Sequence, residues 1–175
     1  MSVTSFQMME GYIGMSDREN KHHAFNNKIE TGLRIIAILY ASFPDSLDLQ
    51  ELLYLDYLTV HSGDYDIKNK SLHPDNPFRK GEIFVRRSII TEGVKFFIAK
   101  GLVLQNFNPT GVKYSASENA SPFIENLNEE YFLALKKKAQ LLIKKINMIG
   151  NKQFKAEMES FIMNLDNNFI PKLIS

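Results

Sequence analysis

The chain has 175 residues, of which 44% are hydrophobic and 23% charged, a globular balance that excludes an intrinsically disordered protein. A chain of this length buries about 70% of the surface that its unfolded form exposes, so one domain with a helical extension needs no disulfide for stability. It has no cysteine and a net charge of +1. These features exclude thiolate chemistry and Cys-based zinc sites, and they give no overall attraction to nucleic acid.

The N-terminal residues 1–26 contain no basic start followed by an apolar run, and the chain has no apolar stretch near the roughly 18 residues of a membrane span. We therefore expect a soluble, cytoplasmic protein without a membrane contact. The lack of cysteines fits a reducing compartment. Residues 1–26 form an expected N-terminal arm, packed either on the chain's own domain or on another molecule.

Two helices are predicted after this arm. Asn27 is a good N-cap for the first helix, which Pro44 ends. Asp48 caps a second helix that runs to about His61, and Gly63 supplies the break after it.

A long loop, a third helix and a hairpin follow. Segment 62–80 contains a glycine and two prolines and is predicted to be a loop, and loops of this length are usually functional. The third helix spans about 81–99, and two short strands at 102–107 and 112–117 flank a turn. Three helices followed by a hairpin are the element order of a winged helix.

The predicted fold class is therefore mainly α (α+β). We expect a winged-helix-like domain with a β-hairpin wing over residues 27–125 and a long C-terminal extension of amphipathic helices over residues 126–175, interrupted near Gly150. The first helix of this extension has a heptad-like apolar stripe. The stripe packs on the chain's own domain or, since it is longer than one small domain needs, binds a partner helix. Its candidate partner-binding residues are Phe132, Leu135, Leu142, Ile146 and Ile149.

Lysines occupy the other faces of the same helix. Three interpretations of these lysines are open. They form a solvated face, they contact non-specifically DNA that is held by a larger complex, or they bind the surface of an acidic partner. The candidates for DNA contact are Lys137, Lys138, Lys144 and Lys145.

Two of the predicted helices place charged side chains among apolar ones. Asp56 falls within the apolar stripe of the second helix, and Arg86 and Arg87 fall within that of the third. Buried charges are tolerated only when paired. We therefore predict that Asp56 pairs with Arg86 or Arg87, with Glu82 as a further partner one turn before Arg86. The alternative is that these side chains reach the rim and stay solvated.

If both arginines face inward, the outward arc of the third helix is nearly neutral, which is a poor match for a phosphate-dominated interface. The long loop also departs from the short turn of a classical DNA-reading motif. Sequence-specific DNA binding by this helix is therefore disfavoured. The residues of its outward arc are Phe84, Ser88, Thr91, Glu92 and Lys95.

Catalytic motifs are missing from the sequence. His61, Asp64 and His73 carry groups that suit divalent ions, but their spacing matches no metal motif. No nucleophile elbow surrounds Ser62, and no glycine loop of the phosphate-binding type is present. We expect no catalytic residue, no metal and no cofactor. A small metal hydrolase using His61 and His73 is the alternative, which bound metal would reveal.

The strings LDYLTVHSGD and SLHPDNPFRKGEIFVRRSIITEGVKFFIAKGLV resemble the middle component of the ABC-three-component systems, a group that includes the Lamassu defence systems. The resemblance covers about residues 50–104 and consists of several short motifs in the same order. Its loop contributes His61, Ser62, Gly63, Asp64, His73, Pro74 and Arg79.

The resemblance implies an accessory subunit without known catalysis in bacterial defence against phages or plasmids. It also implies two partners, an SMC-like coiled-coil ATPase that senses foreign DNA and an effector, often a nuclease. We expect a non-catalytic subunit that bridges the two, with DNA reached indirectly through the complex. The alternative function is a winged-helix DNA-binding transcriptional regulator, which predicts a symmetric dimer and sequence-selective DNA binding.

Overall fold

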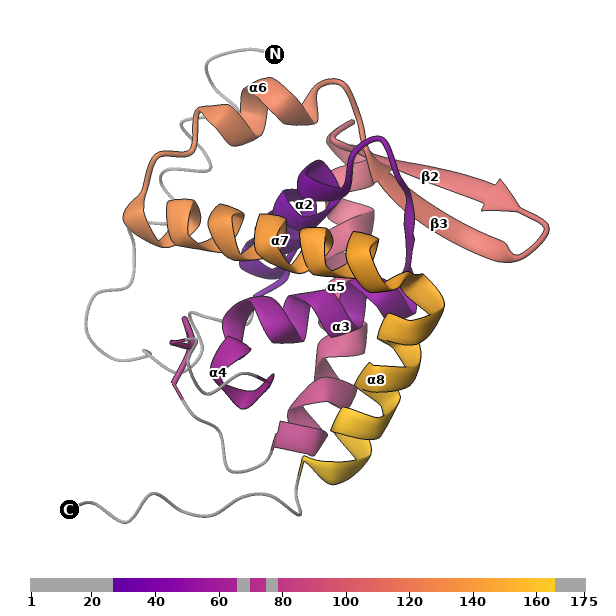
Figure 1. The fold of residues 1–175 in the computed structure, drawn as a ribbon. Coiled ribbons are helices and arrows are strands. Elements are labelled where there is room, and N and C mark those ends of the chain that lie inside the picture. Colours follow the sequence, from indigo (N-terminus) through magenta and orange to yellow (C-terminus); the bar gives the residue numbers. More distant parts are fainter. Residues whose placement is uncertain (1–26, 66–69, 75–78, 166–175) are drawn as a thin grey trace.

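The computed structural model describes residues 27–65, 70–74 and 79–165 (Figure 1). This part of the chain is mainly helical and contains a small three-stranded antiparallel sheet. The predicted N-terminal arm, the end of the predicted C-terminal extension and Pro77 of the predicted loop lie outside the described residues. Within the described ranges, no helix is long and apolar enough to cross a membrane.

The first two helices are α2 (Lys28–Ser42) and α3 (Leu49–Val60), and both begin at the predicted caps. The side-chain oxygen of Asn27 accepts two N–H bonds from the first turn of α2, each 2.9 Å long. Asp48 does the same for α3, and its own N–H donates to the Glu51 carboxylate at 2.7 Å. This reciprocal pair is a capping box, which fixes where α3 starts.

The bounds predicted for the loop, residues 62 and 80, are wrong at both ends. Helix α3 ends with His61 as its C-cap, and the next residues form the short helix α4 (Ser62–Tyr65), which includes the glycine expected to break the chain. Helix α5 (Arg79–Ala99) begins two residues before the predicted start.

Three strands form the sheet in the order β1-β3-β2. The hairpin of β2 (Val103–Asn108) and β3 (Gly111–Ala116) lies within one residue of the predicted bounds and projects away from the helices in Figure 1. Strand β1 (Leu47–Asp48), which was not predicted, pairs with β3 through Leu47 opposite Tyr114. The sheet therefore ties the residues just before α3 to the hairpin.

The C-terminal part contains α6 (Ala120–Glu125), which was not predicted, then α7 (Glu130–Ile149) and α8 (Asn151–Asn164). Gly150 separates α7 from α8 with a φ of 85°, a conformation that glycine adopts without strain. Figure 1 shows α7 lying across α2 and α3, while α8 turns down beside α3. The interruption predicted at Gly150 is thus the point where the chain changes direction.

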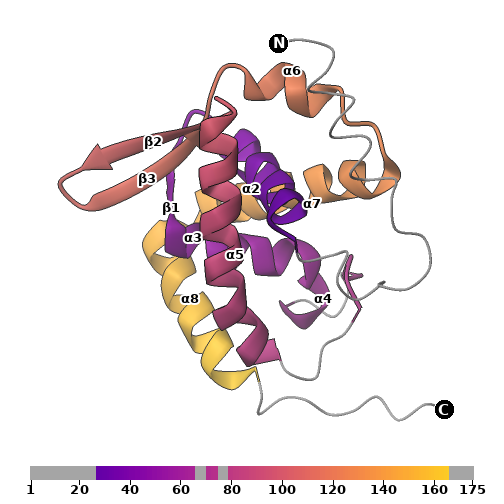
Figure 2. The ribbon, with the colours of Figure 1, turned by 180° about the vertical axis from the view of Figure 1, so that it is seen from behind.

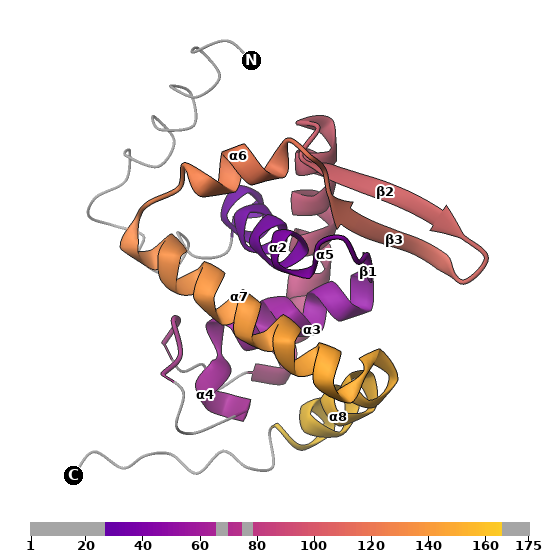
Figure 3. The same cartoon turned by 45° about the horizontal axis from the view of Figure 1, so that its top comes forward.

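Helix α2 lies at the centre of the molecule. Figure 3 shows it enclosed by α3, α5, α6 and α7, and the side chains of Ile35, Ile36, Ile38 and Leu39 are fully buried. Figure 2, which views the molecule from behind, shows helix α5 crossing in front of α2.

The crossing of α2 and α5 depends on two glycines. A Cβ atom added to Gly93 would lie 2.9 Å from the backbone nitrogen of Gly32 and 2.9 Å from the carbonyl oxygen of Lys28. Phe97 packs against Gly32 on the same side. The two helix backbones therefore approach more closely than any larger residue would allow.

Candidate functional site

A cluster of charged side chains lies inside the molecule where α2, α3 and α5 meet. Asp56 on α3 is fully buried and accepts bonds from two guanidinium groups, Nε of Arg34 at 2.6 Å and Nη1 of Arg86 at 2.5 Å. Arg34 and Arg86 are themselves only 1% and 2% exposed. Each oxygen of one carboxylate therefore joins a different helix to α3, which is the geometry that makes a buried charge tolerable.

The cluster continues along α5 to the end of α3. The guanidinium of Arg86 also donates to Glu82, one turn earlier on the same helix, with the Nε–Oε1 distance at 2.9 Å. Nε2 of His61 lies 3.1 Å from the same Glu82 oxygen. We call Arg34, Asp56, His61, Glu82 and Arg86 the charged core.

A second branch joins the charged core to α7. Arg34 donates from Nη1 to Glu30 at 3.2 Å, and the hydroxyl of Tyr131 donates to the same Glu30 oxygen at 3.3 Å. Nε2 of His73 lies 2.9 Å from that hydroxyl, and the two rings are stacked. The branch therefore joins α2, α7 and the segment between α4 and α5.

The motif residues of this segment are bonded to the helices around it. Asp64 accepts from the hydroxyl of Tyr57 at 2.7 Å and forms an ion pair with Arg79 at 2.9 Å. The backbone N–H groups of Leu72 and His73 both donate to the carbonyl of Val60, at 2.9 and 3.1 Å. These bonds hold His73 against the end of α3, while Pro74 is exposed.

Two more hydrogen bonds, each involving a serine, join α4 to the segment that follows it. Ser62 donates from Oγ to the carbonyl of Lys70 at 3.2 Å, and the N–H of Gly63 donates to Ser71 at 3.0 Å. Lys138 of α7 donates to both Ser62 and the Lys70 carbonyl, at 2.5 and 2.6 Å. The described residues of the motif are therefore tied into the fold rather than gathered around an open space.

The electrostatics of the cluster follow from its pairing. Burial acts to raise the pKa of Asp56, but Arg34 and Arg86 outweigh it and hold that pKa below its usual value. Burial likewise acts to raise the pKa of Glu82, and the hydrogen bond from His61 and the charge of Arg86 lower it instead. Burial, then the charges of Arg34 and Arg86, lowers the pKa of His73 to about 3. The carboxylates are thus ionised and His73 is neutral near pH 7.

The prediction of the pairs missed one arginine and misplaced another. No pair was predicted for Arg34, although it stands in the apolar run LRIIAILY, where an unpaired cation would be costly. The structure places Arg87 on the exposed side of α5, where its Nη1 donates to Gln50 at 2.9 Å. Arg86 alone of the two neighbours reaches Asp56.

This placement changes the outward surface of α5. Phe84 and Val85 are 73% and 63% exposed, and the exposed Arg87 and Lys95 are accompanied by Glu92. The outward arc thus carries one cation more than the sequence predicted. It is a mixed surface, not a basic stripe of the kind that binds phosphates.

The predicted partner-binding stripe of α7 mostly faces the chain's own core. Phe132, Leu135 and Ile146 are at most 5% exposed, and Leu142 and Ile149 are partly buried against the same core. Helix α7 uses this stripe to cover α2 and α3, because those helices present apolar side chains there. Of the two alternatives, the burial of these side chains favours packing on the chain's own domain, and docking of a partner on this stripe stays an untested prediction.

The lysines predicted to contact DNA are divided between two surroundings. Lys137 and Lys144 are exposed. Lys138 is bonded to the segment after α4, and Lys145 donates to the hydroxyl of Tyr65 at 2.7 Å. Two of the four lysines therefore serve the fold.

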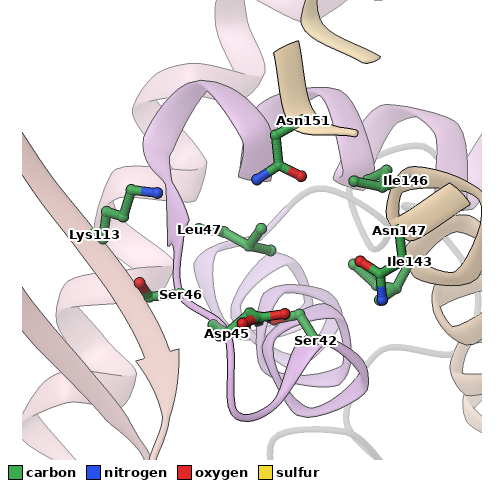
Figure 4. Close-up of a pocket in the computed structure, with 9 residues that line it drawn as sticks. All are labelled: Ser42, Asp45, Ser46, Leu47, Lys113, Ile143, Ile146, Asn147 and Asn151. Carbon is green, nitrogen blue, oxygen red and sulfur yellow. Dashed lines mark hydrogen bonds between the residues drawn. The ribbon is translucent and has the colours of Figure 1, made fainter. Parts of the chain in front are cut away.

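A polar cavity of about 290 Å³ lies elsewhere, between β1, β3 and the α7–α8 junction (Figure 4). Among its lining residues are Asp45, Lys113, Asn147 and Asn151. None of the predicted loop or charged-core residues lines it. Ile146 and the buried Leu47 also line it, and the described lining residues contain no nucleophile paired with a base.

His61, Asp64 and His73 carry side chains of the kind that bind divalent metal ions. Their side chains are directed to Glu82, to Tyr57 and Arg79, and to Tyr131 respectively. Within the ranges that the structure describes, no group of three or more histidine and carboxylate side chains is arranged to hold a metal ion.

A mainly helical subunit with its motif residues in an internal network fits a class of accessory proteins, the middle components of ABC-three-component systems. Residues 24–168 match the family model described as "ABC-three component (ABC-3C) system Middle Component 2". The match spans most of the chain, and the chain belongs to this family. No curated protein and no solved structure is significantly similar to it. The chain is therefore an accessory middle component of a multi-component defence system.

Proposed function

We propose that the chain is a non-catalytic scaffold of its defence system, of the Lamassu type, and bridges an SMC-like coiled-coil ATPase and an effector in the bacterial cytoplasm. The observation that carries the proposal is the charged core. The residues best suited to acid–base chemistry are buried and bonded to each other. Asp56, Glu82 and His73 each have partners on other elements, so they hold the shape of the molecule instead of acting on a substrate.

The fold supports a binding role. We assign α2, β1, α3, α5 and the β2–β3 hairpin to a winged-helix-like domain over residues 27–125, because three helices with a strand before the second and a hairpin after the third follow that order. The C-terminal extension then begins at residue 126 and includes α7 and α8. Exposed apolar residues on α5 and α7, among them Phe84 and Leu141, leave two different faces available to partners, as a bridging subunit requires.

A winged-helix transcriptional regulator is the competing function, and α5 is the helix that would read DNA. Its outward side includes exposed Phe84 and Val85 next to Arg87, with Glu92 two turns from Val85. Exposed apolar side chains in the second turn of such a helix favour a protein contact, because phosphate contacts supply most of the affinity for DNA. Any DNA contact is therefore indirect in this proposal.

Co-expression with the products of the neighbouring genes tests the function. We expect the full chain to co-purify with a coiled-coil ATPase and an effector in a defined stoichiometry by size-exclusion chromatography with light scattering. We also expect the purified chain alone to hydrolyse no nucleotide and to show no sequence-selective DNA binding in an electrophoretic shift assay.

Two outcomes would overturn the proposal. Failure of the chain to co-purify with either neighbour would remove the bridging role. Nanomolar, sequence-selective DNA binding by the chain alone, with a steep loss of affinity as salt is raised, would favour the regulator.

A further inference from the structure

The outward side of α7 differs from its buried stripe. Leu133, Leu141 and Met148 are 47%, 57% and 78% exposed, and Lys137 and Lys144 lie exposed between them. Figures 1 and 3 show α7 at the front of the molecule, and no described element lies over this side. The helix therefore presents apolar and cationic side chains together to its surroundings.

The spacing of these residues has a definite period. Lys137, Leu141, Lys144 and Met148 are separated by steps of four, three and four residues, which is the period of a coiled-coil seam. One seam position carries lysine and the other carries Leu or Met. From Leu133 to Met148 the surface is about 22 Å long, or roughly four helical turns. A second α-helix presents its side chains with the same period, so a helix is the structure that would match this surface.

The charge of this surface indicates which kind of partner helix would bind to it. Between Leu133 and Met148 the sequence has five lysines and no aspartate or glutamate. Lys136 donates to the carbonyls of Ile124 and Leu127, and Lys138 and Lys145 are bonded within the fold, as described above. Lys137 and Lys144 have no hydrogen-bond partner in the described part of the chain. A facing helix with carboxylates opposite these two lysines would complement them, and the lysine stems would cover apolar surface between.

We propose that this side of α7, made of Leu133, Lys137, Leu141, Lys144 and Met148, is a docking surface for an acidic amphipathic helix of a partner protein, packed on α7 in coiled-coil geometry. The inference rests on the proposed role as a subunit of a complex. It goes further by naming the surface and the chemistry of the partner segment. The partner helix carries Leu or Ile at one seam position and Glu at the other.

A pair of designed helical peptides tests the surface on the full chain. One 28-residue peptide has Leu and Glu at the two seam positions, and the other has Leu and Lys. Fluorescence anisotropy should show that the acidic peptide binds and that the basic peptide binds at least about tenfold more weakly. The variant Lys137→Glu/Lys144→Glu should reverse this preference, since both changes are on an exposed face and leave the core untouched.

A matched control separates the surface from the overall charge. Lys95→Glu/Lys152→Glu changes the net charge by the same amount at exposed positions of α5 and α8 and should bind the acidic peptide within about twofold of the wild type, since both lysines lie off the α7 seam. Leu141→Ser/Met148→Ser should weaken it at least about tenfold. Equal binding by the wild type and the α7 variants, or loss in the control as well, would overturn the proposal.

Three further outcomes separate the docking surface from a nucleic-acid contact and from the bridging function. If the acidic peptide fails to bind while Lys137→Glu/Lys144→Glu abolishes retention of a 30-base-pair DNA duplex, the surface is a nucleic-acid contact and the proposal is wrong. If the wild type co-purifies with its neighbours and the α7 variants do so equally well, the surface is wrong although the bridging function stands. If the peptide binds but the wild type co-purifies with neither neighbour, the bridging function fails and the surface remains.

Discussion

Helices α2 and α5 are joined in two places by opposite kinds of chemistry. Where Gly32 and Gly93 cross, the nearest atoms are backbone atoms and the ring of Phe97. Steric contact between these atoms limits how closely the two helices approach each other. In the charged core, Arg34 and Arg86 are joined through the two oxygens of the single carboxylate of Asp56.

This difference shows that the separation of α2 and α5 and their register are set by separate interactions. Steric exclusion at the glycines fixes the separation of the two helices, but apolar packing tolerates small slides and rotations. Each charge of the core needs a partner in one position, since an unpaired buried charge is costly. The charged core therefore fixes the rotation and axial position that the glycine crossing leaves open.

The largest effect is expected from Asp56→Ala. This change leaves two guanidinium groups buried without their shared counter-charge and should lower the free energy of unfolding by about 3–5 kcal/mol. Urea denaturation followed by circular dichroism would measure it. A loss below about 1 kcal/mol would mean that the arginines are solvated, contrary to the structure.

A triple replacement sharpens the same comparison. In Arg34→Met/Asp56→Leu/Arg86→Met the desolvation cost of these three charges is gone, so the loss of stability should be smaller than in Asp56→Ala, although Glu30 and Glu82 each lose an arginine partner. The near-ultraviolet circular dichroism spectrum of this variant should then show whether the helices keep one register without the three charges.

The next largest effect is expected at the glycine crossing. Gly93→Ala places a methyl group against backbone atoms of α2 and should cost about 1–3 kcal/mol, even though alanine favours a helix. Gly81→Ala is the matched control in the same helix, since a Cβ there meets nothing within 4 Å. The control should be neutral or stabilising by up to about 1 kcal/mol. Thermal unfolding of both variants compares them directly.

A smaller effect follows from the pKa of His73, which burial lowers to about 3. Between pH 6.5 and that value the unfolded chain binds a proton that the folded chain does not, so stability falls as the pH falls through this window. Going from pH 7.5 to 5.5 should cost about 1 kcal/mol from this residue. The groups facing it are His61 of α3, Glu30 and Arg34 of α2, Arg86 of α5 and Tyr131 of α7.

The variant His73→Gln isolates the contribution of this group. Glu30, whose pKa burial raises, acts in the opposite direction and is present in both proteins. The difference in pH slope between the wild type and the variant is therefore the quantity to measure, by denaturation at several pH values. Parallel slopes would show that the pKa of His73 is the same in the folded and the unfolded chain.

The smallest effect is expected from Arg87→Ala. Its guanidinium is exposed and bonded to Gln50, so stability should change by no more than about 0.5 kcal/mol. Arg86→Ala should cost several times more, as it leaves Asp56 and Glu82 with one counter-charge fewer. Equal losses at the two neighbours would contradict the different surroundings that the structure gives them.

The elements with local signals were the ones that sequence reasoning found. Caps at Asn27 and Asp48, and the glycine at 150, act within a few residues of themselves, so they mark boundaries of helices directly. Strand β1 has only two residues and exists because it pairs with β3 more than sixty positions later. Helix α6 has six residues, too few to show a period.

The charged core was predictable in kind but not in detail. An aspartate within an apolar stripe implies a buried cation, but a helical projection places Arg86 and Arg87 only about 100° apart and both within the arc of the stripe. Which of the two turns inward depends on where α3 lies. Arg34 carries the same signal as Asp56, a charge in an apolar helix, and reading α2 in that way would have found it.

Asp56 accepts from a residue 22 positions before it and from one 30 positions after it. A folding intermediate with α2 docked on α3 but α5 still detached would bury the carboxylate with half of its bonds, and the reverse intermediate would have the same defect. Such half-assembled states are disfavoured, so α2, α3 and α5 should open and close as one cooperative unit in native-state hydrogen exchange.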